Sequence, residues 1–185
     1  MSFVVKNMNF KIKETKTIFN GKVFDIKIDE IEYDSGNEGV REIVVHNGGA
    51  VVLPVTDKGK VVFVKQYRYP FDEFMYELPA GKLEKAEDPL VCATRELTEE
   101  TGYTSDKVSY LGKIYTTPGF CTEILYLYLA ENLVAGEHDR EEGEYGMEVY
   151  EFTLKEIDDM INTGKIVDGK SLSALYFYKN KKEDN

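Results

Sequence analysis

The sequence contains little cysteine, little histidine and no long apolar run, and each shortage argues against a class of protein. Two cysteines cannot build the disulfide framework of a small secreted domain, so we expect a reducing compartment. Two histidines, His46 and His138, are too isolated to suggest a metal cluster. No stretch approaches the ~18 consecutive apolar residues of a membrane span, and residues 1–16 contain no apolar signal core. We therefore expect a cytoplasmic protein that does not cross a membrane.

Positive charge is also scarce. The chain has 23 Lys and Arg residues against 34 Asp and Glu residues, which gives a formal net charge of −11. Binding to nucleic acid without sequence preference needs a basic surface, so we expect no nucleic-acid partner. The same charge would repel an anionic substrate. Hydrophobic residues make up 42% of the 185 residues, which is enough to build the core of one domain.

Apolar alternation and turn signals predict several strands. Asn20-Gly21 lies between two alternating stretches and predicts a hairpin within residues 17–29. Lys58-Gly59 lies between two valine-rich stretches, which predict a second hairpin whose strands are buried on both faces. The strands of this second hairpin cover residues 50–57 and 60–68, and the further predicted strands cover 41–46, 108–117 and 122–133.

Three helices follow from capping signals and from the spacing of apolar residues. The first begins at Asp88-Pro89 and ends at Gly102, the second begins with a capping box at 153–156, and the third covers 170–180. Strands, one central helix, more strands and terminal helices predict an α+β fold or a layered α/β/α sandwich. We expect a small N-terminal β region at 1–45, a main domain at 46–180 and a flexible tail at 181–185.

Glutamates crowd together on the first predicted helix. Glu96, Glu99 and Glu100 lie three and four residues apart and share one face. A second face, formed by Leu90, Ala93, Leu97 and Thr101, is predicted to pack on the core. The acidic face is consistent with ordinary solvation. It is also consistent with a bound Mg²⁺ or Mn²⁺, which prefers carboxylate oxygens and would bridge an acidic protein to a phosphate.

The residues around this cluster resemble the Nudix box. That pattern has a glycine, five residues, a glutamate, seven residues, then Arg-Glu, an apolar residue, any residue, Glu-Glu, any residue, a glycine and an apolar residue. The matching positions are Gly81, Glu87, Arg95, Glu96, Leu97, Glu99, Glu100, Gly102 and Tyr103. All of them agree, with an aromatic residue at the last position where an aliphatic residue is usual.

The resemblance implies a Nudix α/β/α sandwich with a mixed sheet that cleaves a nucleoside diphosphate linked to another group. It implies a Mg²⁺ site, with Mn²⁺ as a possible substitute. The residues that it assigns are Glu96 and Glu100 as ligands, Glu99 as a ligand or supporting carboxylate with a role in catalysis, and the carbonyl of Ala80 as a further ligand. Arg95 would orient a glutamate, and Glu87, Gly81 and Gly102 would hold the box in shape.

Other stretches resemble the ADP-ribose pyrophosphatase branch of the Nudix family, over residues 17–178. They are "KQYRYP", "YELPAGKLE", "TTPGFCTE", "GKIVDGKSLSAL" and "VREIVVHNGGAVVLPV". This resemblance implies that ADP-ribose and water give AMP and ribose 5-phosphate. It places five residues at the substrate, namely Arg41, Arg68, Glu77, Pro118 and Phe120. Phe120 and Tyr67 are the candidates for stacking on adenine.

The general base is expected on the polar, glycine-punctuated loop at 138–149. Glu144 is the first candidate and Glu142 the second, and turnover by a Glu144→Gln variant tests this assignment. By resemblance we also expect a homodimer. Two alternatives stay open, namely a pyrophosphatase for GDP-mannose or another nucleotide sugar, and a Nudix-like module that binds a nucleotide without turnover. Such modules tend to lose box glutamates, whereas this chain has all of them.

Overall fold

The computed structural model describes residues 10–137 and 146–183. The chain divides into two compact units. The first comprises residues 1–47 and 117–123, and the second comprises residues 48–116 and 124–185. The Nudix-like stretch from Gly81 to Tyr103 lies wholly within the second unit. None of the helices in the described residues is long and apolar enough to span a membrane.

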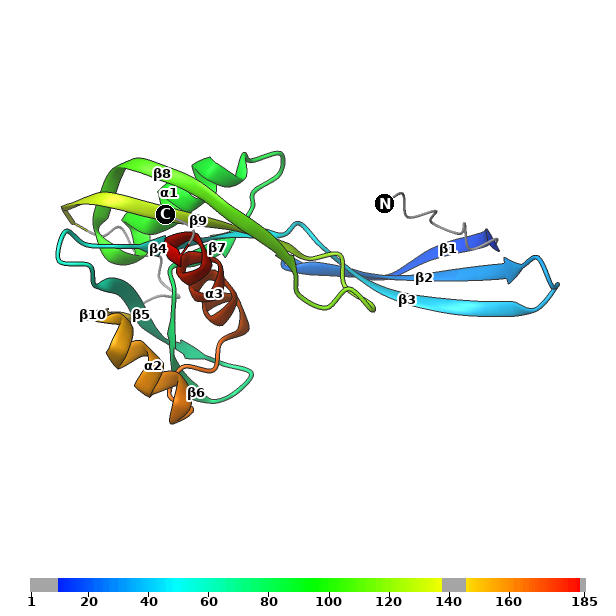
Figure 1. Ribbon diagram of the computed structural model, residues 1–185. Helices are drawn as coiled ribbons and strands as arrows, with labels where there is room; N and C mark the ends of the chain where they lie inside the picture. Colours follow the sequence, from blue (N-terminus) through cyan, green and yellow to red (C-terminus); the bar gives the residue numbers. More distant parts are fainter. Residues whose placement is uncertain (1–9, 138–145, 184–185) are drawn as a thin grey trace. The chain divides into compact units, whose positions relative to one another are not determined.

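The first unit contains a three-stranded antiparallel sheet in the order β1-β2-β3 (Figure 1). Its strands are β1 (Phe10–Asn20), β2 (Phe24–Tyr33) and β3 (Glu38–His46). The hairpin predicted at Asn20-Gly21 is confirmed, and the N–H of Gly21 donates to the carbonyl of Phe24 at 3.1 Å. The segment 117–123 is joined to β3 by two backbone bonds at Val44, whose N–H donates to Phe120 and whose carbonyl accepts from Thr122.

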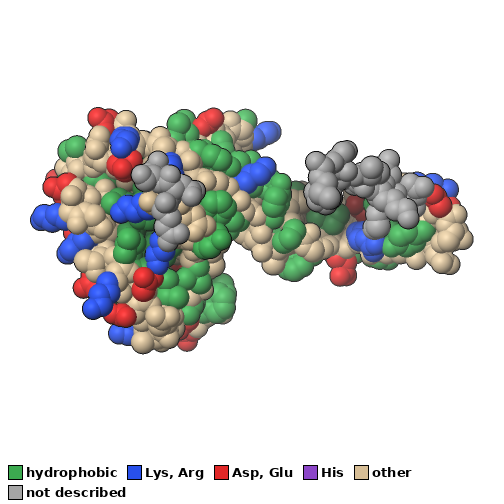
Figure 2. All heavy atoms as spheres, viewed as in Figure 1, with side chains coloured by type: hydrophobic (Ala, Val, Ile, Leu, Met, Phe, Trp, Pro, Cys, Tyr) green, Lys and Arg blue, Asp and Glu red, His purple; other side chains and the backbone are tan. Residues whose placement is uncertain are grey.

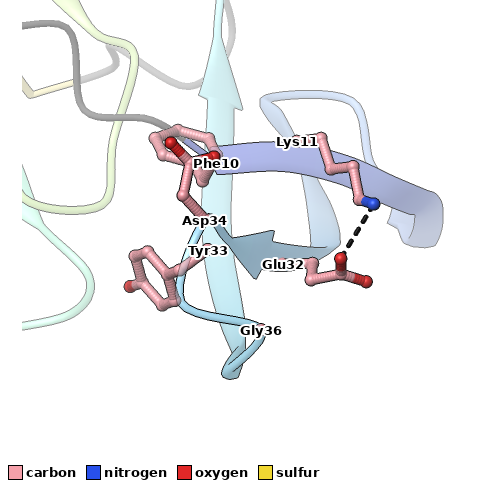
Figure 3. Close-up of a pocket in the computed structure, with 6 residues that line it drawn as sticks. All are labelled: Phe10, Lys11, Glu32, Tyr33, Asp34 and Gly36. Carbon is pink, nitrogen blue, oxygen red and sulfur yellow. Dashed lines mark ion pairs between the residues drawn. The ribbon is translucent and has the colours of Figure 1, made fainter.

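This sheet leaves much apolar surface uncovered in the single chain. All residues of β1 are exposed, including the apolar residues Phe10, Ile12, Ile18 and Phe19. Figure 2 shows hydrophobic side chains on the visible face of this unit. One end of the sheet carries a hollow lined by Phe10, Lys11, Glu32, Tyr33, Asp34 and Gly36 (Figure 3). There the ammonium group of Lys11 lies 2.8 Å from the Glu32 carboxylate.

The second unit is built on two sheets. Its strands are β4 (Gly49–Pro54), β5 (Val61–Arg68), β6 (Glu73–Glu77), β7 (Ala80–Lys82), β8 (Tyr103–Tyr115), β9 (Ile124–Ala135) and β10 (Glu148–Phe152). One sheet has the order β7-β4-β9-β8 and the other has the order β10-β5-β6. The pairing of β4 with β9 is parallel and the other pairings are antiparallel, so the larger sheet is mixed.

The predicted hairpin around Lys58-Gly59 is wrong, because its two strands do not pair with each other in one sheet. The turn itself forms, because Gly59 has a φ of +71° and its N–H donates to the carbonyl of Thr56. Beyond one bridge between Val55 and Val61, however, β4 and β5 belong to different sheets. Both strands are largely buried, as their valine-rich sequences predict. Each strand obtains its partners from distant segments, so long-range pairing overrides the local turn signal.

Helices cover both faces of the larger sheet (Figure 1). They are α1 (Pro89–Thr101) and α3 (Gly169–Glu183), whereas α2 (Leu154–Asn162) packs beside β10 of the smaller sheet. Alternate residues of β4 separate two cores, because Ala50 and Val52 pack with Leu97 of α1, whereas Val51 and Leu53 pack with Leu175 of α3. The predicted α/β/α arrangement with a mixed sheet is therefore confirmed, and it fixes α1 against the edge strand β7.

Candidate active site

The helix that carries the glutamates has the ends that the sequence predicts. The side chain of Asp88 accepts a hydrogen bond from the N–H of Leu90 at 2.8 Å, and Pro89 occupies the first turn. At the other end Gly102 adopts a φ of +77° and its N–H donates to the carbonyl of Thr98. These two caps fix the length of α1 and therefore the position of every glutamate on it.

The acidic face of α1 is not a solvated face. Glu96 is 6% exposed and Glu100 is 2% exposed, so both carboxylates are buried. Leu90, which we predicted to face the core, is 41% exposed instead. The other residues predicted to face the core are buried, and Glu96 and Glu100 lie beside them in the same buried part of the helix; they are Ala93, Leu97 and Thr101. Burying two carboxylates is costly unless hydrogen bonds or cations compensate.

The edge strand β7 receives these carboxylates. A Cβ atom on Gly81 would lie 1.7 Å from Oε1 of Glu96, so only glycine leaves room for this side chain. One residue earlier, the N–H of Ala80 donates to Oε2 of Glu100 at 3.2 Å. Thus Gly81 of the box leaves the space that the Glu96 carboxylate fills.

Arg95 connects the cluster internally. Its Nε and Nη2 donate to both oxygens of Glu87 at 3.1 and 3.3 Å, a bidentate pair that ties the box loop to α1. Its Nη1 donates to Glu96 at 2.7 Å and to Glu99 at 2.8 Å. The hydrogen bonds from Arg95 and from the N–H of Glu84 lower the pKa of Glu87. One guanidinium therefore offsets the repulsion among three carboxylates.

A hollow of about 420 Å³ opens beside this cluster. It is lined by Gln66, Arg68, Ala80, Gly81, Lys82, Glu84, Arg95, Glu96, Glu99 and Glu100. The structure thus brings together the four predicted metal ligands, Arg95 and Arg68. Within residues 10–137 and 146–183, no three His, Cys, Asp or Glu side chains are arranged to hold a metal ion as they stand. The carboxylates of Glu96 and Glu99 are instead turned towards Arg95.

Arg68 enters the hollow from the end of β5. Its Nε and Nη2 donate to the two oxygens of Glu77 on β6, at 2.7 and 2.6 Å. Glu77 is 2% exposed, whereas the side chain of Arg68 is 38% exposed. Burial alone would raise the pKa of Glu77, but the bonds from Arg68 and the charge of Lys170 outweigh it and lower that pKa. Its ionised form therefore stabilises the fold near neutral pH, and this contribution is lost as the pH falls through the lowered pKa.

Lys170 is a charged residue near the site that sequence reasoning missed. It lies in the first turn of α3, and its ammonium group is bonded to Glu77 and lies 3.0 Å from the Asp168 carboxylate. Asp168 caps α3 by accepting from the N–H of Ser171 at 3.0 Å. The pattern Asp-Gly-Lys-Ser at 168–171 carries the capping signal, but nothing in it indicates the distant partner Glu77.

The other predicted substrate residues belong to the first unit. Arg41 donates to the hydroxyl of Tyr33 at 2.5 Å and lies over its ring. Phe120 is 54% exposed and, together with Arg41, lines a hollow of that unit. Pro118 precedes it in the same segment. The candidates for the general base, Glu142 and Glu144, lie outside the described residues.

Cys92 lies next to the cluster but is not a nucleophile. It is fully buried against α1 and β4 neighbours, and burial raises its pKa to about 12, assisted by the negative charge of Glu87. The thiol therefore stays protonated near neutral pH.

Comparison with known proteins identifies relatives along most of the chain. The family model described as NUDIX domain matches residues 45–175. An ADP-ribose pyrophosphatase of Bacillus subtilis (strain 168) is 42% identical over 175 residues, which cover 94% of each chain. A methanol dehydrogenase activator of Bacillus methanolicus is 40% identical over 169 residues, covering 90% of this chain and 91% of the relative. A solved structure described as an ADP compounds hydrolase matches with a TM-score of 0.85 at 17% identity, covering 95% of each chain, and supports the fold.

Proposed function

The chain belongs to the NUDIX domain family, and on that premise we propose that it hydrolyses the diphosphate of ADP-ribose or a related nucleoside diphosphate sugar. The observation that carries the proposal is the hollow in which buried Glu96 and Glu100 lie with Arg68 and Arg95. With ADP-ribose, the oxygen of water would attack one phosphorus atom and the bridging P–O bond would break. The products would be AMP and ribose 5-phosphate, which together contain all atoms of ADP-ribose and water.

The hollow fits a divalent metal ion by the chemistry of its donors. Its anionic groups are carboxylate oxygens, which are hard ligands, and Gly81 lacks the Cβ that would occupy the place of the Glu96 carboxylate. We propose that Glu96, Glu99, Glu100 and the carbonyl of Ala80 hold Mg²⁺, or Mn²⁺ in its place. When bound, such an ion supplies charge that polarises a phosphoryl oxygen and lowers the pKa of water.

The side chains of the chain have separate tasks in this proposal. Glu96 and Glu99 would turn from Arg95 to the cation, while Arg95 keeps its bidentate pair with Glu87 and so holds α1 and the box loop together. Arg68 would present its guanidinium to the diphosphate. Of the two arginines that line the hollow, Arg95 donates to the box glutamates, whereas Arg68 donates to Glu77. Arg41, Pro118 and Phe120 remain proposed contacts of the nucleoside or the sugar. Glu144, or Glu142, remains the proposed base that accepts the proton of water.

A panel of nucleotide sugars tests the proposed activity. With Mg²⁺ present, we expect ADP-ribose to be hydrolysed with the highest kcat/KM, and we expect a metal chelator to stop the reaction. The panel contains ADP-ribose, ADP-glucose, GDP-mannose and UDP-glucose, with products identified by chromatography. A higher kcat/KM for GDP-mannose would favour the alternative substrate. Tight binding of ADP-ribose without release of AMP would favour a binding module and contradict the enzyme.

We propose that the protein acts as a homodimer. The apolar surface of the first unit supports this, because Ile12, Ile18 and Val40 are 56–58% exposed in the single chain and such surface usually contacts a partner. Light scattering should give twice the chain mass of 21.2 kDa. A Val40→Glu variant should shift the protein towards the monomer, whereas Lys22→Glu, a charge change in the same unit, should not. A monomeric wild-type protein at micromolar concentration would contradict the proposal.

The two cysteines support a reducing, cytoplasmic location in this proposal. Both are free thiols, and Cys92 is fully buried in the core beside α1. Disulfides are rare in the cytoplasm, where thiols are kept reduced.

A further inference from the structure

The hollow contains one arginine whose position is fixed from behind by buried charges. Arg68 uses Nε and Nη2 for the bidentate pair with Glu77, at 2.7 and 2.6 Å. That geometry leaves Nη1, the remaining nitrogen of the guanidinium, outside the pair. A planar guanidinium held by two parallel bonds has a defined orientation, which a single bond would not give it.

Glu77 cannot serve as the substrate contact that the sequence suggested. It is 2% exposed, both of its oxygens accept bonds from Arg68, and Lys170 donates to one of them. A buried carboxylate with two cationic partners is held in one place. If it moved away from either cation, a buried charge would lose its partner. It is therefore an anchor rather than a group that faces a ligand.

The anchor continues into α3 through Lys170. The ammonium group of Lys170 joins Glu77 and Asp168, and Asp168 also accepts hydrogen bonds from the backbone and hydroxyl groups of Ser171. Ser171 in turn accepts a hydrogen bond from the N–H of Leu78 at 2.8 Å, directly beside Glu77 in the chain. Ser171 and Leu78 are both fully buried. The start of α3 is thus tied to the end of β6 by a set of buried and partly buried polar contacts.

We propose that Glu77 and Lys170 are positioning residues that hold the Arg68 guanidinium in the box hollow in the orientation that receives a substrate diphosphate. This inference rests on the proposed function, because it deepens the role of the same hollow. Two positive and two negative side chains, Arg68 and Lys170 with Glu77 and Asp168, balance one another, so the network adds no net charge behind the hollow. Its effect on catalysis would pass through Arg68 alone.

Chemical labelling of Arg68 tests the positioning without any substrate. Phenylglyoxal reacts with accessible guanidinium groups, and mass spectrometry of peptides reports each arginine separately. In Glu77→Gln, which keeps the shape of the side chain but removes its charge, we expect Arg68 to be labelled several-fold faster than in the wild type. Arg95 serves as an internal reference, because its bonds to the box glutamates are unchanged. Lys170→Met should accelerate labelling of Arg68 to a smaller extent.

A matched control lies on the same helix. Lys179 of α3 also forms an ion pair with an acidic residue, Asp158 of α2, but it does not line the hollow. Lys179→Met should leave the labelling of Arg68 unchanged. The double variant Glu77→Gln/Lys170→Met removes both charges of the Glu77–Lys170 ion pair and so keeps the net charge of the network unchanged if the single variant folds poorly. It should also label Arg68 faster than the wild type.

Kinetics tests whether Glu77 acts through Arg68. With ADP-ribose, Glu77→Gln should lower kcat/KM by about tenfold or more, mostly through KM, because the guanidinium is misplaced. In an Arg68→Met background the same substitution should have no further effect, since residues that act through one group are not additive. A full additional loss in that background would overturn the proposal. So would unchanged labelling of Arg68 in both Glu77 variants.

The labelling and the kinetic experiments together distinguish a failure of this inference from a failure of the proposed function. If the wild-type protein hydrolysed no nucleotide sugar, the proposed function would fail, while labelling of Arg68 would still decide whether Glu77 and Lys170 hold it. If the protein hydrolysed ADP-ribose normally in Glu77→Gln, the activity would stand and the positioning role would fail.

Discussion

The Glu100→Gln variant is expected to lose hydrolysis of ADP-ribose by about a hundredfold to a thousandfold, because several kcal/mol of transition-state stabilisation depend on the cation that Glu100 would hold. Glutamine keeps a carbonyl oxygen that can accept the hydrogen bond from the N–H of Ala80, which Glu100 now accepts at 3.2 Å. The fold should therefore survive while the charge is lost. Steady-state kinetics at saturating Mg²⁺ and thermal unfolding measure the two effects separately.

A second readout for this variant does not depend on turnover. Electron paramagnetic resonance of free Mn²⁺ should show weaker binding of the ion to Glu100→Gln than to the wild type. Glu131→Gln is the matched control, because Glu131 of β9 forms a surface ion pair with Lys107 of β8. Such surface pairs contribute little to stability. Wild-type affinity for Mn²⁺ in Glu100→Gln would remove Glu100 from the proposed set of ligands. Wild-type turnover would do the same.

Local signals predicted the helix of the site well. The caps at Asp88 and Gly102 are short-range features, since each depends on hydrogen bonds within a few residues, and the structure has both. The box spacing also placed Glu96, Glu99 and Glu100 on one helix at fixed separations. What the spacing could not give was the burial of two of these carboxylates. Glu96 is buried where Gly81 of β7 leaves room for its carboxylate, and Glu100 is buried where the N–H of Ala80 donates to it.

Features that depend on long-range pairing were predicted less well. The short strands β6, β7 and β10 have too few residues for a periodic signal, and the sequence analysis did not predict them. The turn at Lys58-Gly59 is real, but β4 and β5 part after it because each pairs with distant strands. Lys170 was missed for the same reason, since Glu77 lies far from it in the sequence and only the fold brings the two together.

Gly81→Ala is expected to reduce activity by about a hundredfold, because a displacement of about 1 Å at a reacting site can cost that much. The new Cβ would lie 1.7 Å from Oε1 of Glu96, so one of the two must move. The backbone of β7 is paired with β4, at Ala50 opposite Gly81, whereas the carboxylate is the far end of a flexible side chain. The carboxylate should therefore yield, and the strand should stay in place.

This argument separates activity from stability for Gly81→Ala. Gly81 has no positive φ, so alanine fits its backbone and reduces the entropy of the unfolded chain. We expect a change in the free energy of unfolding within about 1 kcal/mol, measured by denaturant titration. Gly169→Ala is the control, because a Cβ at Gly169 meets no atom within 4 Å, and it should keep full activity.

Two other outcomes for Gly81→Ala would not support the role given to Glu96. If the variant kept wild-type turnover, the Glu96 carboxylate could be displaced without consequence and would not be a ligand. If it unfolded far more easily, the strand rather than the side chain would have moved, and the loss of activity would say nothing about Glu96. Loss of activity in a stable protein is the outcome that identifies the glycine of the box as the space reserved for a catalytic carboxylate.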